Sequence, residues 1–264
     1  ILFICVLVIC DILFNDLSVE RTIYLAVVAL SMMSGYLDDA SSKPWNEYVK
    51  GGIDLLLSVA IAVNYLFYNG NTIYLGILGG RNISIPYPVF GLLIVVLVWT
   101  AINVTNCTDG VDGLSASLSI VTLGTFYVIM SHNGGINDFT YTIMLCMVTL
   151  IGYLWFNASP STILMGDAGS RALGVMIAIA ALKSGSPFLY IPISLVMLLD
   201  GGLGLLKVAL LRFLKIKILK NTRCPLHDHA RKAIGWSDTQ VCYRFVLMQL
   251  IISLVTVWTY WMML

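Results

Sequence analysis

The sequence predicts an all-α integral membrane protein, a polytopic bundle of transmembrane helices. Of its 264 residues, 59% are hydrophobic and only 11% are charged, with a mean hydropathy of +0.90. A soluble domain typically has about 25% charged residues. Apolar runs close to the length needed to cross a bilayer as a helix, about 17 to 25 residues, recur along the whole chain. These runs lack the apolar–polar alternation of transmembrane β-strands, which excludes a barrel.

Apolar runs between polar breaks define nine candidate helices in a single membrane domain over residues 1–264. They are expected at residues 1–14, 22–37, 52–68, 89–105, 114–130, 140–156, 171–183, 187–205 and 241–263. The first run opens at Ile1 with no Met and no basic leader segment before it, so we expect a segment upstream of it to be missing.

Two connecting segments have patterns of their own. Residues 69–88 contain Gly and Asn between short β-prone pieces, which predicts a small extracytoplasmic hairpin. Residues 207–220 alternate cations with apolar residues. This pattern is typical of a helix that emerges into the cytosol or lies along the membrane interface, and equally of a basic flank that stops membrane insertion.

Four polar connections, after the second, fourth, sixth and eighth spans, must face the same compartment, because each span reverses the side of the membrane. Of the 15 Lys and Arg residues, we place all but Arg21, Arg81 and Lys183 on that side. By the positive-inside rule this side is cytoplasmic. Its basic residues would attract lipid headgroups and phosphorylated substrates. The net charge of +1 gives no indication of nucleic-acid binding.

Acidic and imidazole side chains gather in these four connections. They are Asp38 and Asp39, then Asp109 and Asp112, then Asp167, then His227 and His229. Grouped carboxylates repel one another, and near a low-dielectric boundary the cost rises unless a cation neutralises them. Oxygen ligands without Cys suit Mg²⁺ or Mn²⁺ rather than zinc. The sequence therefore predicts one shared cation site at the membrane surface.

Each cluster also has an ordinary structural interpretation. The pair Asp38 and Asp39 could be a solvated loop, and the two His could be surface imidazoles. Asp109 to Asp112 could form a turn and the N-cap of the helix that begins at Leu114, although such a helix end also offers N–H donors to a phosphate. That all four clusters lie on one side of the membrane by chance is less plausible than chance in any single case. A shared site is therefore the better interpretation.

Four motifs, in this order, carry a resemblance to a known family. They are GYLDDA (35–40), NVTNCTDGVDGLSAS (103–117), MGDAGSRALG (165–174) and PLHDHARKAIGWSD (225–238). The chain resembles the polyprenyl-phosphate N-acetylhexosamine-1-phosphate transferases from about Gly35 to Phe245. Its tail KAIGWSDTQVCYRF (232–245) is more similar to members that use UDP-N-acetylmuramoyl-pentapeptide than to those that use UDP-GlcNAc.

The resemblance implies a Mg²⁺-dependent transferase in the bacterial cytoplasmic membrane, its active site facing the cytoplasm. It also implies ten transmembrane helices, so that with nine expected here the N-terminal helix is missing. Phospho-N-acetylmuramoyl-pentapeptide would pass from the UDP-linked donor to undecaprenyl phosphate. The products would be UMP and lipid I, a precursor of cell-wall peptidoglycan. The family also implies a homodimer. The physics fits, because a cationic cleft at the bilayer surface is where a membrane lipid and a soluble polyanion can meet.

The resemblance assigns roles to single residues. Asp167 would be the metal ligand, Asp38 the base that deprotonates or orients the lipid phosphate, and Asp39 a support for metal or phosphate geometry. His227 and His229 would contact the nucleotide substrate. The other expected substrate-binding residues are Asn103, Asn106, Asp109, Asp112, Gly113, Leu114, Asn157 and, for the lipid phosphate, Lys50.

Two positions depart from the family pattern. Asp228 stands between His227 and His229 where relatives usually have a third His. Residues 163–165 are Ile-Leu-Met, where relatives often have an aromatic residue on which the uracil stacks. Stacking must then come from elsewhere or be replaced by aliphatic contact.

Two competing functions remain open at this point. A transferase of the same fold that uses UDP-GlcNAc is the nearer one, since only the tail argues against it. An ion-coupled transporter is the alternative from another class, because acids within a membrane often mark ion pathways. The acids here lie in connections at one surface and not at mid-bilayer, which favours the enzyme.

Overall fold

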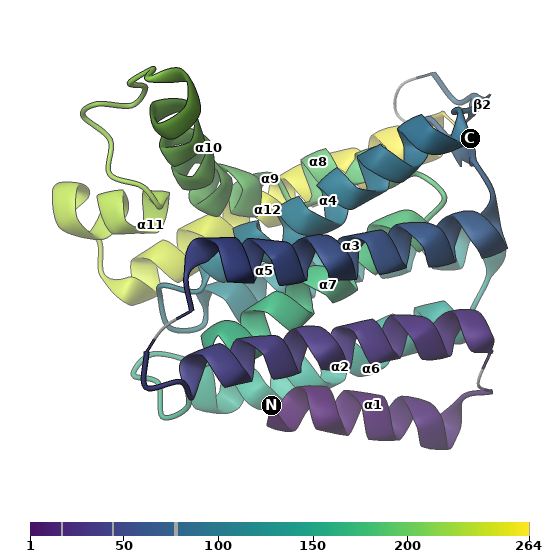
Figure 1. Cartoon of the computed structure of the whole chain (residues 1–264), viewed down its shortest axis with the longest axis horizontal. Coiled ribbons are helices and arrows are strands. Elements are labelled where there is room, and N and C mark those ends of the chain that lie inside the picture. The colour runs from purple at the N-terminus through teal and green to yellow at the C-terminus, as the bar shows by residue number, and fades with distance from the viewer. Residues whose placement is uncertain (17, 44, 77–78, 264) are drawn as a thin grey trace.

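The computed structural model describes residues 1–16, 18–43, 45–76 and 79–263, and it is built almost entirely of helices (Figure 1). The long helices are α1 (Leu2–Phe14), α2 (Val19–Asp39), α3 (Glu47–Asn69), α4 (Tyr87–Thr108), α5 (Leu114–Gly134), α6 (Asp138–Asn157), α7 (Gly166–Lys183) and α12 (Asp238–Met262). The short ones are α8 (Tyr190–Ile193), α9 (Leu195–Met197), α10 (Leu203–Ala209) and α11 (Leu226–His229). Every predicted span contains a helix, so the all-α class is confirmed.

Five helices, α3, α4, α5, α6 and α12, are long and apolar enough to cross a membrane. A bent pair, Pro187–Ile193 with Leu195–Leu214, makes a sixth if it counts as one span. Of the other predicted spans, α1 has only 13 residues, while α2 and α7 carry charged residues at their ends. The nine predicted spans are thus nine helical segments in the described chain, and at most six pass this test.

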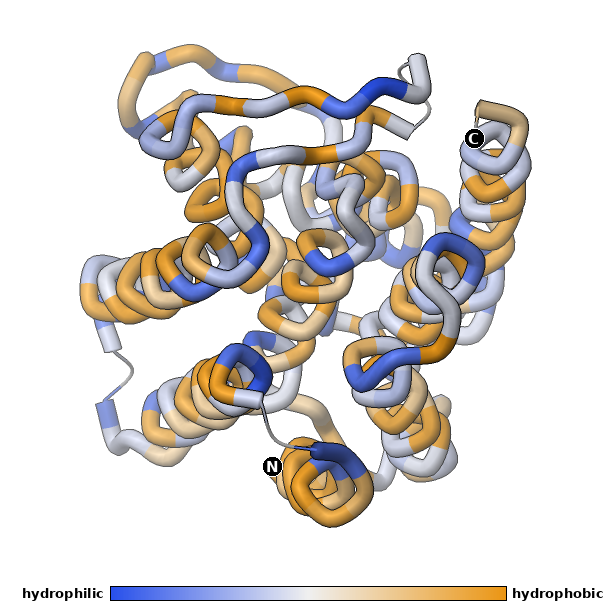
Figure 2. Tube along the Cα trace, turned by 90° about the vertical axis from the view of Figure 1, so that its right-hand side faces the viewer, coloured by the Kyte–Doolittle hydropathy of each residue, from blue (hydrophilic) through white to orange (hydrophobic). Residues whose placement is uncertain are grey.

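Apolar residues recur along the helices at the periphery of the bundle as well as through its middle, as the hydropathy colouring of the trace shows (Figure 2). Phe67 and Leu254, for example, are 79% and 69% exposed. Monomeric soluble proteins rarely expose large continuous apolar surfaces. A multi-pass membrane protein does, because the lipid chains are as apolar as the side chains that face them.

Helix α7 is the centre of the bundle. From Ala168 to Leu182 all its residues are buried, and it packs against α2 and α4. The contact with α4 depends on Gly174, where an added Cβ would lie 2.6 Å from the carbonyl oxygen of Ala101. A helix surrounded by other helices does not contact lipid on every side and need not be apolar throughout. For this reason α7 tolerates charged residues near its ends.

A two-stranded hairpin lies at the end of the bundle where α3 ends and α4 begins (Figure 1). Strand β1 (Thr72–Tyr74) pairs antiparallel with β2 (Asn82–Ser84), and Ile73 is opposite Ile83. The predicted hairpin is therefore confirmed. The hydroxyl of Tyr74 donates to the carbonyl of Met263 at 3.0 Å, which ties the hairpin to the end of α12.

The helix predicted at 187–205 is present but broken, because the chain bends by 69° between Ile193 and Leu195. Pro192 has no N–H to bond to the carbonyl one turn earlier and its ring crowds that turn, which kinks a helix. Beyond the bend, helical backbone continues to Leu214 and stops at Lys215, whose φ is +57°. Helix α10 leans away from the bundle (Figure 1), so the first half of segment 207–220 is a helix that projects from it.

Gln249 of α12 repairs the backbone at this bend. Its amide nitrogen donates to the carbonyl of Pro192 at 3.1 Å, and its amide oxygen accepts from the N–H of Val196 at 2.9 Å. In an unbroken helix these two backbone groups would bond to each other. Gln249 is fully buried, so it satisfies both groups where water cannot.

Replacing Gln249 with Leu would leave the Pro192 carbonyl and the Val196 N–H unpaired in an apolar environment. An unsatisfied buried group costs about 1–3 kcal/mol, so we expect Gln249→Leu to lower the melting temperature and to speed hydrogen exchange at Val196. Met248→Leu, at the 44% exposed neighbouring position, is the control. Equal stability of the two variants would contradict this role for Gln249.

Candidate active site

Three carboxylates meet where the end of α2 reaches the start of α7. One oxygen from each of Asp38, Asp39 and Asp167 lies within 4.8 Å of the other two. The side chain of Asp39 also accepts a hydrogen bond from the backbone N–H of Asp167 at 3.0 Å. A carboxylate is stabilised there, because the first turn of a helix presents free N–H groups and positive dipole charge. The structure thus joins two of the four predicted clusters.

The two helices approach this closely because residue 35 of α2 is Gly. A Cβ built on Gly35 would lie 2.4 Å from the backbone carbon and oxygen of Asp167. No side chain fits in that space. The sequence motif GYLDDA therefore contributes a contact surface as well as two carboxylates.

Lys50 and Asn106 hold the carboxylates in place. The ammonium of Lys50 pairs with Asp38 and lies 3.5 Å from the second side-chain oxygen of Asp167. Asn106 donates to the other oxygen of Asp167 at 2.9 Å and to the Ser170 hydroxyl at 3.1 Å. Lys50 was expected at the lipid phosphate, and the structure places it among the acids.

The connection between α4 and α5 is anchored to the connection between α6 and α7. The Asp112 carboxylate accepts from the backbone N–H of Ser161 at 3.0 Å and from its hydroxyl at 2.8 Å. The N–H of Gly113, whose φ is +76°, donates to the side chain of Asn157 at 3.1 Å. Asp112, Gly113 and Asn157 therefore fix loop geometry beside the carboxylates.

Two other predicted residues of this region have their contacts within the protein: Asn103, which is half-buried, and Leu114. Asn103 donates to the Trp99 carbonyl at 2.8 Å and to Asp54 at 3.4 Å. The Leu114 side chain is completely buried in the core, and its N–H donates to the Val111 carbonyl at 3.0 Å. Leu114 therefore supports the loop through packing. A substrate contact of its side chain would need the core to open.

Asp109 ends α4 and is the titratable group that this environment perturbs most clearly outside the helices. Burial and the negative charge of Asp167 raise the pKa of Asp109 to about 7, and a backbone hydrogen bond from Gly166 limits the rise. A carboxyl group that is partly protonated near neutral pH marks a functional-site candidate.

His227 brings the fourth cluster to the same place. Its backbone N–H donates to Asp200 at 2.7 Å, and its Nδ1 lies 2.9 Å from the other oxygen of Asp200. Both residues are buried. A Cβ built on Gly110 would lie 2.3 Å from His227 Nε2, so the opposite ring nitrogen faces the 109–113 loop. The contact of Nδ1 with the Asp200 side chain orients the ring.

His229 lies differently from His227. Its Nδ1 accepts from the N–H of Arg223 at 3.3 Å, so it closes the loop that precedes α11. Asp228, in the position of the missing third His, pairs with Lys232 at 2.7 Å, and this hydrogen bond lowers the pKa of its carboxyl. The structure gives both residues local partners.

Sequence reasoning missed several polar partners of the site, including Asp200, Ser161, Ser170 and the buried pair of Asp54 and Arg171. A signal was present for Asp54 and Asp200, because an acid inside an apolar run needs a partner within the protein. For the Ser residues there was no such signal, since Ser is frequent in connections of every kind. The roles of the predicted site residues stay predictions.

Asp38, Asp39 and Asp167 together are called the carboxylate group below. Their ligand atoms fit a hard divalent cation. Asp38, Asp39 and Asp167 offer only oxygen ligands, which Mg²⁺ prefers. Mg²⁺ usually takes one or two protein carboxylates and keeps water or phosphate oxygens in its other positions. The three carboxylates are therefore more than the one or two protein ligands that a Mg²⁺ ion usually needs.

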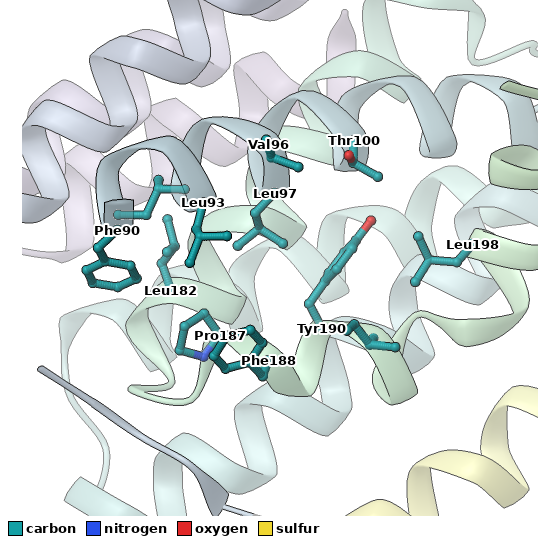
Figure 3. Close-up of a pocket in the computed structure, with 12 residues that line it drawn as sticks. Phe90, Leu93, Val96, Leu97, Thr100, Leu182, Pro187, Phe188, Tyr190 and Leu198 are labelled. Atoms are coloured by element: carbon teal, nitrogen blue, oxygen red, sulfur yellow. The ribbon is translucent and has the colours of Figure 1, made fainter. Parts of the chain in front are cut away.

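An apolar cavity of about 250 Å³ lies between α4 and the segment that follows α7 (Figure 3). Leu93 and Leu97 of α4 line one side, and Phe188 and Tyr190 the other. The cavity reaches Thr100, one helical turn before Asn103. It thus ends close to the carboxylate end of the bundle.

Comparison with known proteins assigns the family. The model of glycosyl transferase family 4 matches residues 21–185. A phospho-N-acetylmuramoyl-pentapeptide-transferase of Treponema pallidum (strain Nichols) is 41% identical over 83% of this chain and 65% of its own length. A protein of the same name from Borrelia hermsii is 30% identical over 98% of this chain and 79% of its own.

The chain therefore belongs to glycosyl transferase family 4, and the resemblance carried by its four motifs is confirmed. It spans about 65% of the length of the Treponema relative that it matches.

A methyl group at position 35 would push α2 away from the backbone of Asp167. Overpacking of this kind costs about 1–3 kcal/mol, so we expect Gly35→Ala to lower the melting temperature. The matched control is Gly52→Ala in α3, where an added Cβ meets nothing within 4 Å. Ala is the better helix former there, so the control should be as stable as wild type or more so. Equal melting temperatures for both variants would contradict the close contact.

Asp109→Asn should stabilise the metal-free protein as the pH rises. The folded-state pKa of about 7 lies above the ordinary 3.8, so the folded chain holds the proton more tightly than the unfolded chain. Ionisation of Asp109 therefore lowers the free energy of unfolding of the wild type. This loss is absent below pH about 4 and increases as the pH rises to about 7. Asn cannot ionise. In thermal unfolding with a chelator present, the melting temperature of the variant should exceed that of the wild type by an amount that increases over this pH range. A pH-independent difference would contradict it.

Proposed function

We propose that the chain transfers phospho-N-acetylmuramoyl-pentapeptide from UDP-N-acetylmuramoyl-pentapeptide to undecaprenyl phosphate, giving lipid I and UMP for peptidoglycan synthesis. The observation that carries this proposal is the convergence of three carboxylates, the 109–113 loop and His227 at one end of the bundle. The names of the family relatives support the choice of substrates. The excess of Lys and Arg at this end supports a cytoplasmic orientation in the bacterial cytoplasmic membrane, and family resemblance supports a homodimer.

In the proposed reaction an oxygen of the lipid phosphate attacks the β-phosphorus of the nucleotide sugar. The bond from that phosphorus to the bridging oxygen breaks, and UMP leaves with the electron pair. Phosphoryl transfer needs positioning and neutralisation of charge more than covalent help. Mg²⁺ held by Asp167 with Asp38 and Asp39 would supply the neutralising charge.

The residues of the chain have separate tasks in this scheme. A phosphate monoester has its second pKa near 6 and is already largely dianionic at neutral pH, so Asp38 would orient the lipid phosphate more than deprotonate it. Lys50, paired with Asp38 and close to Asp167, would approach the same phosphate. His227, oriented by Asp200, would present Nε2 to the nucleotide beside the 109–113 loop.

The apolar cavity in Figure 3 supports a lipid acceptor. It runs along α4 from Phe90 to Thr100, and the next turn of that helix carries Asn103. The part of a polyprenyl chain next to its phosphate would fit this cavity and leave the phosphate at the carboxylate end. The membrane lipid and the water-soluble nucleotide sugar would then meet at the same place.

A transfer assay tests the proposal directly. The full chain in nanodiscs is incubated with undecaprenyl phosphate and either UDP-N-acetylmuramoyl-pentapeptide or UDP-GlcNAc, with and without Mg²⁺. We expect UMP and a lipid-linked sugar phosphate from the muramoyl donor, and only with Mg²⁺. Preference for UDP-GlcNAc would establish the alternative transferase. No product from either donor, together with ion flux across liposomes, would favour a transporter.

Asp167→Asn removes a carboxylate from the proposed cation site. Charge stabilisation by a catalytic metal is worth several kcal/mol, so we expect UMP release to fall at least about 100-fold while the melting temperature changes little. Asp16→Asn, at an exposed position between α1 and α2, is the control and should keep full activity. Near-normal UMP release by the Asp167 variant would remove that residue from the mechanism.

A further inference from the structure

A second set of charged side chains lies one helical turn further along α3 and α7, toward the hairpin end of the bundle. The guanidinium of Arg171 in α7 pairs with Asp54 in α3, and both residues are only 2% exposed. Asn103 of α4 also donates to Asp54, at 3.4 Å. An ion pair buried among membrane helices is expensive to form, and such residues are usually functional.

This pair and the pair above it form a ladder of complementary charge between α3 and α7. On α3, Lys50 is followed four residues later by Asp54. On α7, Asp167 is followed four residues later by Arg171. Residues four apart lie on one face of a helix. Both helices run from the carboxylate end toward the hairpin end (Figure 1), so Lys50 lies opposite Asp167 and Asp54 opposite Arg171.

The order of the charges allows only one alignment of the two helices. A slide of one turn, about 5.4 Å, would place Lys50 beside Arg171 or Asp54 beside Asp167. Like charges would then meet in a buried environment, where their repulsion is strong. Helices α3 and α7 both pack against α2 and α4, and the ladder adds a direct link between α3 and α7 to those contacts.

Stability alone does not explain such a pair. Replacing a buried ion pair by apolar residues of similar volume is often neutral or stabilising, and the best-attested use of buried charge is to fix register. Asp54 and Arg171 together are electrically neutral. Their effect on the carboxylates above them is therefore one of position.

We propose that Asp54 and Arg171 are a pair of positioning residues that holds Lys50 against Asp167 and thereby sets the affinity of the carboxylate group for a divalent cation. This inference rests on the cation site of the proposed function. It does not depend on which nucleotide sugar or lipid is the substrate.

The test is the affinity of the full chain for Mn²⁺, measured by electron paramagnetic resonance without nucleotide or lipid. In the double variant Asp54→Leu with Arg171→Met we expect the protein to fold and its Mn²⁺ dissociation constant to rise about 10–100-fold, the range typical when groups that orient metal ligands are lost. An unchanged dissociation constant in the folded variant would overturn the proposal.

The control is a second buried pair at the opposite end of the bundle. Arg21 lies 3.3 Å from Asp11, and both are buried. Asp11→Leu with Arg21→Met should leave Mn²⁺ affinity at the wild-type value. If this control weakened Mn²⁺ binding as much as the test variant, general loosening would explain both and the positioning role would fall.

A second variant covers the case in which the apolar pair fails to fold. Asp54→Asn with Arg171→Gln keeps polar groups at both positions but removes the charge order, so the same loss of Mn²⁺ affinity is expected. Wild-type affinity in this variant would overturn the proposal. A wild-type chain that binds Mn²⁺ but transfers no sugar phosphate would refute the proposed function alone, and the titrations would still decide the role of this pair.

Discussion

The contact between α2 and the first turn of α7 is the constraint on which the site depends. With no side chain at Gly35, the backbone of Asp167 lies directly against α2, and Asp39 can accept the free N–H at the start of α7. This contact places three carboxylates within reach of one cation. Lys50 and Asn106 then complete the surroundings of Asp167 from α3 and α4. One backbone contact thus brings the acids of α2 and α7 together, and residues from α3 and α4 complete the site.

Buried acidic and basic side chains elsewhere in the described part of the bundle are paired across helices. Arg171 pairs with Asp54, His227 with Asp200, and Arg21 with Asp11. Each pairing follows from the low dielectric of the interior, where an uncompensated charge is costly. The carboxylate group is different in kind, because three acids share one ammonium from Lys50 and an amide from Asn106. Negative charge is in excess there, and that excess is what a divalent cation would balance.

The sequence was sufficient for the fold class, the positions of the helices and the meeting of the four acidic and His-containing connections. These follow from long apolar runs and from the alternation of sides, which are properties of the bilayer. It was not sufficient for the bend after Ile193, because Pro192 alone does not reveal whether a distant side chain will accept the freed backbone groups. The partners of Asp54 and Asp200 were missed for a similar reason. Which turn of one helix faces which turn of another depends on packing, and a single sequence does not contain that information.

The amide of Gln249 has a consequence for how the bilayer itself acts on the protein. It joins α12, whose outer face carries exposed residues such as Leu254 and Trp258, to both halves of the bent helix. The second half leads through Asp200 to His227. A helix whose apolar length differs from the membrane thickness adjusts by tilting. Tilting of α12 in a thicker or thinner bilayer would therefore be transmitted through Gln249 to the second half of the bent helix, and through Asp200 to the imidazole of His227. Lipid composition would then affect the geometry of the site.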